Sequence, residues 1–298
     1  MTIKTIAFQG SPGAYSDLAC RTARPGWKTL PCKTFADTIT AVHEGKADQA
    51  MLACENSLAG RVPDIHTLLP NAGLHIVGEH FQRVEHCLMA IHGAQLEDIK
   101  RVHTHPVAMG QIHTLLKTYN FTPVIEFDTA GAAELVALWN KKEEAAVASE
   151  LAAELNGLNI LQRNVEDAAH NTTRFYIAAR TTDRLSVNTP DVMTTVLFEV
   201  KNTPGALYKV LVGFATNGIN MTRLESYMTA GSFAATRFLM DVEGHPEDTH
   251  LSKALAELEF FSESANILGV YQQSPFRRQM KRALSDAAPN TTTDAIAG

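Results

Sequence analysis

The feature that most constrains the fold is the regular alternation of short apolar runs with amphipathic segments across residues 4–180. This alternation is typical of α/β proteins, in which helices cover a layer of strands. Helices are expected over residues 107–119 and 129–139, and Asp128 or Thr129 can cap the second of them. The expected strands are residues 5–9, 49–53, 74–78, 101–103, 124–127, 146–148 and 174–178.

A second domain is expected after residues 183–193, a polar, aperiodic segment that contains proline and is typical of a linker. Residues 1–182 would then form the first domain, and residues 194–274 the second. The second domain places its apolar patterns in the order βαββαβ, which is ferredoxin-like, with a turn at Ala230-Gly231 between its two middle strands.

A βαββαβ unit covers one face of its sheet with helices, so the open face and the edges favour pairing with a second copy. We therefore expect a homodimer or homotetramer that assembles through this domain. The last segment, residues 283–298, has little apolar content and is expected to be disordered.

The composition argues against several classes of protein. The 298 residues are 45% hydrophobic and 19% charged, without an apolar run of 18 residues, so we expect a soluble protein with no membrane partner. The N-terminal residues lack the pattern of a signal peptide, which predicts a cytoplasmic location. A net charge of -6 argues against a nucleic-acid partner. The four cysteines lack CxxC spacing, which argues against a disulfide framework and a zinc site.

Polar side chains are concentrated in the run Asn-Thr-Thr-Arg-Phe at residues 171–175, at the start of an expected strand. A threonine hydroxyl can donate or accept a hydrogen bond, an arginine can bind a carboxylate through two parallel bonds, and a phenylalanine can form the wall of a site. A polar turn that leads into an edge strand is the alternative interpretation.

Two further segments follow expected strands. Gly10 and Gly13 lie in a turn that can bring helix amides to an anion or can be purely structural, and their spacing does not fit a dinucleotide site. The run Glu-Asn-Ser at residues 55–57 follows a strand that ends at Cys54, where α/β folds place ligands, although a helix cap is an equal alternative. Cys54 is interpreted as a buried thiol rather than a nucleophile.

The pair His103 and His105 suggests a metal site, but a third ligand with suitable spacing is missing. We favour a strand-to-helix turn in which Thr104 caps the helix. Gln111, two turns further along, would then point toward the same cleft.

Taken together, these motifs resemble those of the prephenate dehydratase family. The resemblance runs in order over nearly the entire first domain, and the second domain looks like the ACT regulatory domain of that family. It implies two α/β lobes of the type II periplasmic-binding-protein kind that close over prephenate. The motifs that carry the resemblance are residues 10–16, 55–60, 104–106, 128–133 and 171–175.

The resemblance also implies roles for individual residues, without a metal or an organic cofactor. Thr173 corresponds to the catalytic threonine, and Asn56, Thr104 and Gln111 to an asparagine, a hydroxyl and a glutamine in the cleft. The family more often has serine at the position of Thr104. Residues expected to bind the substrate are Ser11, Glu55, Ser57, Thr129, Ala130, Thr172, Arg174 and Phe175.

The implied reaction removes water and carbon dioxide from prephenate and leaves phenylpyruvate, driven by formation of the aromatic ring. The enzyme must mainly assist the departing hydroxide. We therefore expect Thr173 to donate a hydrogen bond or a proton to the leaving oxygen, and Arg174, Asn56, Thr104 and the amides near Ser11 to hold the carboxylates.

The resemblance implies control by phenylalanine through the second domain. The expected effector residues are Gly205, Ala206, Leu207, Glu225 and Ser226. The family motif usually continues with Arg-Pro, whereas this chain has Tyr227-Met228, which leaves the effector affinity open. The alternatives to a prephenate dehydratase are an arogenate dehydratase and a non-catalytic protein that binds and senses amino acids.

Overall fold

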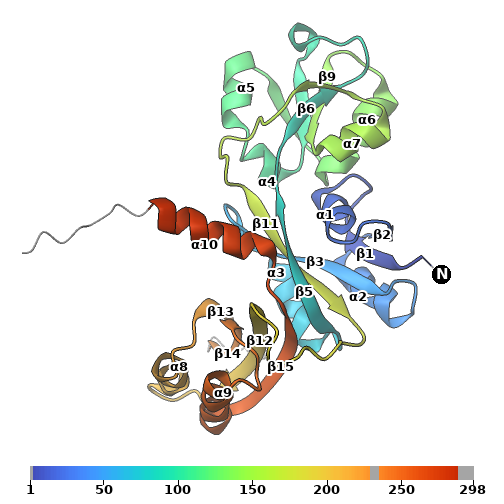
Figure 1. The fold of residues 1–298 in the computed structure, drawn as a ribbon. Coiled ribbons are helices and arrows are strands. Elements are labelled where there is room, and N and C mark those ends of the chain that lie inside the picture. Colours follow the sequence, from blue (N-terminus) through green and yellow to red (C-terminus); the bar gives the residue numbers. More distant parts are fainter. Residues whose placement is uncertain (1–2, 229–234, 288–298) are drawn as a thin grey trace, which may run out of the picture.

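The computed structural model describes residues 3–228 and 235–287, and it folds into two lobes followed by a C-terminal domain (Figure 1). The first lobe and the C-terminal domain share one sheet, with the order β13-β14-β12-β15-β5-β11-β3-β1-β2 and β4 paired to β3. The first-lobe strands are β1 (Thr5–Gln9), β2 (Lys28–Cys32), β3 (Gln49–Asn56), β4 (Gly60–Arg61), β5 (His75–Arg83) and β11 (Thr172–Ala179). Its helices are α1 (Tyr15–Ala23), α2 (Phe35–His43) and α3 (Pro63–Leu68).

The second lobe is built on a separate sheet with the order β10-β6-β9-β7-β8. Its central strand reads Glu-Ala-Ala-Val-Ala and is buried throughout, because helices pack on the sheet. The strands are β6 (Cys87–Ala90), β7 (Arg101–Thr104), β8 (Thr122–Ile125), β9 (Glu144–Ala148) and β10 (Asn159–Gln162). The helices are α4 (Pro106–Met109), α5 (His113–Tyr119), α6 (Thr129–Trp139) and α7 (Glu150–Asn156).

The chain crosses between the lobes twice. Residues 84–86 connect β5 to β6, and residues 163–171 connect β10 to β11. We call these the two crossing segments. Because they are the covalent links between the lobes, any change in the angle between the lobes must be absorbed there.

The C-terminal domain has the predicted order βαββαβ, and its four strands pair as β13-β14-β12-β15. The expected turn at Ala230-Gly231 lies outside the described residues. The elements are β12 (Val192–Val200), α8 (Ala206–Thr216), β13 (Met221–Met228), β14 (Ala235–Glu243), α9 (Thr249–Phe261) and β15 (Ser262–Gln272).

The last helix, α10 (Pro275–Ala287), corrects one expectation. Residues 283–287 are helical rather than disordered, and the remainder of the expected disordered segment lies outside the described residues. In the part of the chain that the structure covers, no helix combines the length and the apolar character needed to cross a bilayer.

The shared sheet depends on a close approach between the first lobe and the C-terminal domain. Gly269 of β15 pairs with Ile76 of β5 in parallel. A Cβ atom at position 269 would lie 2.3 Å from the carbonyl oxygen of Ile76 and 2.6 Å from its Cβ. Only glycine therefore fits at this position without moving one of the two strands.

We expect Gly269→Ala to lower the free energy of unfolding by about 1–3 kcal/mol, because the added methyl group must push backbone apart. The matched control is Gly78→Ala in β5, where the nearest atom to the new Cβ is the Ile177 Cδ1 at 3.7 Å. Urea unfolding of both variants measures the difference. Equal stability of the two would show that the junction of the two domains tolerates a wider spacing.

Candidate active site

Three side-chain amides form a chain of hydrogen bonds between the two lobes. The Asn56 Nδ2 donates to the Asn171 Oδ1 at 2.8 Å, and the Asn171 Nδ2 donates to the Gln111 Oε1 at 2.8 Å. Asn56 ends β3 in the first lobe, Gln111 lies between α4 and α5 in the second, and Asn171 lies fully buried in a crossing segment. The chain therefore links the lobes through the segment on which they would move.

Backbone groups fix the direction of this chain. The Asn56 Oδ1 accepts from the backbone N–H of Leu58 at 3.0 Å and of Ala59 at 2.9 Å. A backbone N–H can only donate, so the Oδ1 must face these groups and the Nδ2 must face Asn171. The Oδ1 of Asn171 then accepts, its Nδ2 donates to the Gln111 Oε1, and the Gln111 Nε2 points away from the chain.

The same asparagine orients Thr173, the expected catalytic residue. The Asn56 Nδ2 donates to the Thr173 Oγ1 at 3.0 Å, so this oxygen acts as an acceptor. Among the described residues the hydroxyl proton of Thr173 and the Nε2 of Gln111 have no hydrogen-bond partner. Both side chains are half-buried. The chain thus leaves one hydroxyl and one amide free to donate to a ligand.

The other expected hydroxyl, Thr104, lies apart from this chain. It is completely buried at the end of β7 and donates to the carbonyl oxygen of Val147 at 2.6 Å. The expectation that Thr104 caps the next helix is wrong, because His105 is the N-cap of α4 and accepts from the Val107 N–H. In this conformation the Thr104 proton is not available to a ligand.

His103 also departs from the metal interpretation. It is buried between two carboxylates, with its Nδ1 2.9 Å from Glu126 and its Nε2 2.9 Å from Glu144. Both ring nitrogens therefore have protein partners. Within the described ranges no group of histidine, cysteine and acidic side chains has the arrangement of a metal site.

Ser11 connects the turn after β1 to the second lobe. Its Oγ donates to the Asp128 Oδ2 at 2.8 Å, and Asp128 caps α6 by accepting from the backbone of Gly131. Thr129 and Ala130 form the first turn of α6, and Ala130 is buried. A cavity of about 390 Å³ lies beside this contact, lined by residues 10–12, 31–33, 127 and 128.

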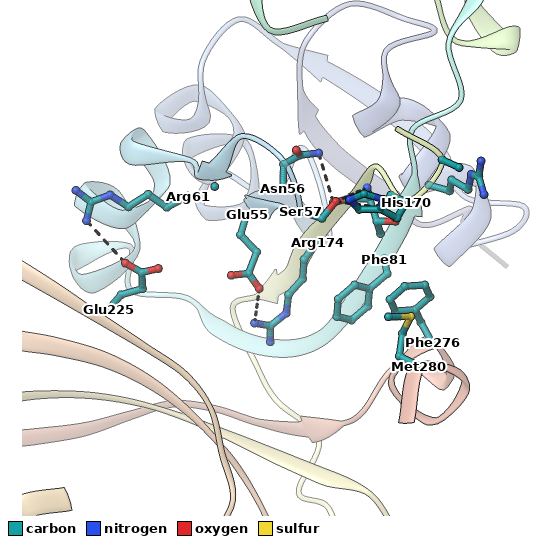
Figure 2. A pocket seen from close by; sticks show the side chains of 14 residues that line it. Glu55, Asn56, Ser57, Arg61, Phe81, His170, Arg174, Glu225, Phe276 and Met280 are labelled. Atoms are coloured by element: carbon teal, nitrogen blue, oxygen red, sulfur yellow. Dashed lines mark hydrogen bonds and ion pairs between the residues drawn. The ribbon is translucent and has the colours of Figure 1, made fainter. Parts of the chain in front are cut away.

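A larger cavity of about 590 Å³ lies where the first lobe, β13 and α10 meet (Figure 2). Glu55, Ser57, Thr172 and Arg174, all expected to bind the substrate, line it together with Asn56. The Ser57 Oγ donates to the His170 carbonyl oxygen at 3.0 Å and accepts from the Thr172 N–H at 3.0 Å. The apolar lining is Phe81, Phe276 and Met280.

Arg174 does not have the surroundings expected of a substrate ligand. It is 2% exposed, although it contributes to the lining of the larger cavity, and each of its three guanidinium nitrogens has a partner in the protein. The Nε donates to Glu79, the Nη1 to Glu55 and Asp241, and the Nη2 to the Tyr271 hydroxyl. The Nη2 also lies 2.7 Å from the Glu79 carboxylate in an ion pair. The guanidinium therefore joins the first lobe to the C-terminal domain, and its nitrogens are engaged by carboxylates and a hydroxyl of the protein itself.

Phe175 is likewise structural in this conformation. It is 1% exposed and belongs to a core cluster with Ile6, Phe8 and Met51 between the sheet and α1. It forms no wall of either cavity described above. The expectation that it lines the substrate site does not fit this burial.

The expected effector residues lie on two elements of the C-terminal domain. Gly205 has a φ of 75° and immediately precedes α8, whose first turn contains Ala206 and Leu207. Glu225 and Ser226 lie on β13, the strand at one end of the shared sheet. The Glu225 carboxylate lies 3.8 Å from the Arg61 Nη1 of the first lobe, so this strand is in contact with the lobe that carries Asn56.

Sequence reasoning missed two residues of the hydrogen-bonded chain and left a third without a role. His86 donates toward Gln111 and Tyr15 contacts His86, as described below. Asn171 was noted only as the first residue of a polar run. No local pattern marks His86, whereas the place of Asn171 two residues before the expected catalytic threonine is a signal in the sequence that could have been used.

Comparisons with known proteins agree with the motifs. A family model for prephenate dehydratase matches residues 6–183, and one for the ACT domain matches residues 194–260. The chain is 69% identical over 276 residues to a bifunctional N-acyl-homoserine lactone acylase/prephenate dehydratase of Komagataeibacter europaeus, covering 93% of this chain and 98% of that one. It is 37% identical to arogenate dehydratase/prephenate dehydratase 2 of Arabidopsis thaliana, covering 89% of this chain and 72% of the relative.

A solved structure shows the same architecture. The prephenate dehydratase of Arthrobacter aurescens in complex with L-Phe is 29% identical and superposes with a TM-score of 0.82, covering 95% of this chain and 98% of the other. The predicted fold, a two-lobed α/β unit followed by a ferredoxin-like domain, is confirmed. The chain belongs to the prephenate dehydratase family of hydro-lyases and carries a C-terminal ACT domain.

Proposed function

We propose that the protein converts prephenate into phenylpyruvate, water and carbon dioxide in the biosynthesis of phenylalanine. The observation that carries this proposal is the amide chain fixed by the backbone of residues 58 and 59, which leaves the hydroxyl of Thr173 and the amide of Gln111 free to donate. The choice of reaction rests on membership of the family. The Thr173 hydroxyl and the Gln111 amide are the hydrogen-bond donors that this reaction needs.

The chemistry requires a donor more than a nucleophile. The bond from the ring carbon to the carboxylate breaks, its electron pair enters the ring, and the bond to the ring hydroxyl breaks as the arene forms. The hydroxyl of Thr173 hydrogen-bonds the departing oxygen and passes it a proton, which Thr173 recovers from solvent water, so that the oxygen leaves as water. Gln111 and backbone amides bind the carboxylates. They also stabilise the negative charge that develops on the leaving oxygen.

A steady-state assay on prephenate and arogenate, side by side, tests the proposal. We expect phenylpyruvate to form from prephenate. Arogenate is the competing substrate, because the description of the Arabidopsis thaliana relative names both activities. Binding of prephenate without turnover would favour the sensing protein instead and would remove the dehydratase assignment.

We further propose that phenylalanine binds near Gly205, Ala206, Leu207, Glu225 and Ser226 and lowers the activity. The complex of the Arthrobacter aurescens relative with L-Phe supports this choice of ligand. The contact of Glu225 with Arg61 offers a direct route from β13 to the first lobe. Assays with and without saturating phenylalanine, alongside calorimetry, test it: binding without any change in rate would remove the inhibition.

The edge position of β13 supports assembly of a homodimer or homotetramer through the ACT domains, since an unpaired strand edge favours pairing with a second copy. Sedimentation of the purified chain tests this. A monomer at all concentrations would contradict it. A cytoplasmic location stays a prediction of the sequence.

A second candidate function is hydrolysis of N-acyl-homoserine lactones. It is favoured by the 69% identity to the bifunctional Komagataeibacter europaeus relative. The cavity of about 590 Å³ with Phe81, Phe276 and Met280 in its lining has the size and the apolar surface that an acyl chain needs. Incubation with an N-acyl-homoserine lactone, followed by detection of the free fatty acid, tests this activity separately from the dehydratase assay.

A further inference from the structure

The amide chain continues beyond Gln111 into the other crossing segment. The Gln111 Oε1 lies 3.0 Å from the His86 Nε2, and the His86 Nδ1 lies 2.8 Å from the Tyr15 hydroxyl. His86 is 1% exposed and immediately precedes β6. Both crossing segments therefore place a buried polar side chain, Asn171 from one and His86 from the other, on the same oxygen atom of Gln111.

The hydrogen-bonding roles of His86 follow from this contact. The Gln111 Oε1 can only accept, so the His86 Nε2 must carry a hydrogen. In the neutral ring the Nδ1 is then an acceptor for the Tyr15 hydroxyl. This hydroxyl has a second acceptor within reach, the Glu85 carbonyl oxygen at 2.9 Å. The ring could therefore exchange its protonated nitrogen without losing the contact with Tyr15.

We propose that Asn171 and His86 are positioning residues that hold the amide of Gln111 with its nitrogen toward the substrate. The inference rests on the proposed dehydratase function, because it assigns the Nε2 of Gln111 to an anionic group of a dicarboxylate. The fixed Nδ2 donor of Asn171 makes the reversed amide unfavourable, since reversal would set its N–H against the N–H groups of Gln111. The N–H on the His86 Nε2 adds to this preference in the tautomer that the ring has here. Only in the observed orientation of the Gln111 amide does an anionic ligand face the Nε2 donor rather than the Oε1.

The location of the two residues gives this arrangement a further consequence. Because Asn171 and His86 lie on the segments that connect the lobes, a rotation of the lobes changes both contacts with Gln111 at once. The Gln111 Nε2 therefore faces the substrate only when both crossing segments keep their contacts with the Gln111 Oε1. Lobe position and orientation of the donor are coupled through three side chains.

The decisive variant is Asn171→Asp, which keeps the shape and the oxygen that accepts from Asn56. At about pH 8.5, far above the ordinary pKa of an aspartate, the new carboxylate cannot donate to Gln111. We expect the Gln111 amide to reverse, so that its nitrogen faces residue 171 and its oxygen faces the substrate. Loss of this donor is expected to reduce kcat/KM for prephenate by about 10²-fold.

A measurement independent of turnover follows the same reversal. The reversed amide donates to the His86 Nε2, which moves the ring proton to the Nδ1. The nitrogen NMR shifts of His86 distinguish these two tautomers. The matched control is Asn159→Asp on the exposed edge of β10, for which we expect wild-type spectra and kinetics. If wild-type protein does not turn over prephenate, the proposed function fails, whereas the spectra still decide the orientation of Gln111.

A second pair of variants separates positioning from folding. His86→Gln keeps an amide donor for the Gln111 Oε1, and His86→Met removes it at similar size. We expect His86→Gln to recover most of the kcat/KM that His86→Met loses, with thermal unfolding recorded for both. The proposal is overturned if Asn171→Asp leaves the His86 proton on the Nε2 with kcat/KM unchanged, or if the two His86 variants are equally active.

Discussion

Thr173→Val is expected to reduce kcat on prephenate by about 10²–10⁴-fold while the protein remains folded. Valine keeps the branched shape of threonine and removes the one hydroxyl proton that the amide chain leaves free. The two N–H groups of the Asn56 Nδ2 retain the Asn171 Oδ1 at 2.8 Å and the Thr172 carbonyl oxygen at 3.4 Å as acceptors, so the substitution leaves neither without a partner. The variant therefore loses a hydrogen bond that stabilises the transition state, so its kcat should fall while its stability changes little.

Thr173→Ser is the matched control for this prediction. Serine retains an Oγ that can accept from Asn56 and donate to the substrate, so we expect it to keep most of the activity that valine loses. Steady-state kinetics of the three proteins, with circular dichroism to confirm folding, give the comparison. A valine variant with kcat within about threefold of the wild type would exclude Thr173 as the donor, because that change is far below the expected effect.

Much of the fold was accessible from the sequence because its pattern is local. The expected strands include the centres of β1, β3, β7 and β9, and residues 129–139 form α6 as predicted. The expected helix over residues 107–119 is broken into α4 and α5, because α4 ends at Gly110. The short strand β2 escaped notice, since Pro31 lies within it.

The site was accessible only in part, because its contacts are distant in sequence. Thr173, Asn56 and Gln111 are joined as the resemblance implied, but Asn171, which joins them, lies 115 residues from Asn56 and 60 from Gln111. An arginine beside a catalytic threonine suggests a carboxylate ligand. That Arg174 instead binds carboxylates of the protein depends on partners 67 and 95 residues away, which no local pattern can indicate.

The burial of Arg174 leads to the prediction with the largest expected effect on stability. One partner whose side chain has no access to water is Asp241 of β14, whose Oδ2 lies 2.6 Å from the Arg174 Nη1. Burial alone would raise the pKa of Asp241, but the nearby guanidinium groups of Arg174 and Arg223 outweigh it and hold that pKa below its ordinary value. The ionised form of Asp241 is therefore stabilised in the folded protein by charges that the unfolded chain lacks.

Arg174→Met is expected to lower the free energy of unfolding by about 3–5 kcal/mol near neutral pH, because it leaves the buried Asp241 carboxylate without its closest cation. The matched control is Arg163→Met, which breaks an exposed pair with Glu150 at 2.7 Å and should change stability little. The double variant Arg174→Met/Asp241→Asn removes both charges together. It should recover much of the loss, since an asparagine oxygen can still accept from Tyr176 and Thr195.

The dependence on pH separates this explanation from a simple loss of packing. In the wild type the depressed pKa of Asp241 means that its stabilisation is present above the unfolded pKa, near 3.9, and is lost as the pH falls through the lower folded value. In Arg174→Met, burial still raises the pKa of Asp241, but only one of the two guanidinium groups that lower it remains. Protonation of Asp241 then removes the charge that has lost its partner, and this stabilises the folded variant. The stability deficit of the variant should therefore shrink as the pH falls from about 7 toward the unfolded pKa near 3.9, as measured by urea unfolding. A deficit that is constant over this range would assign the loss to packing of the arginine side chain and not to its charge.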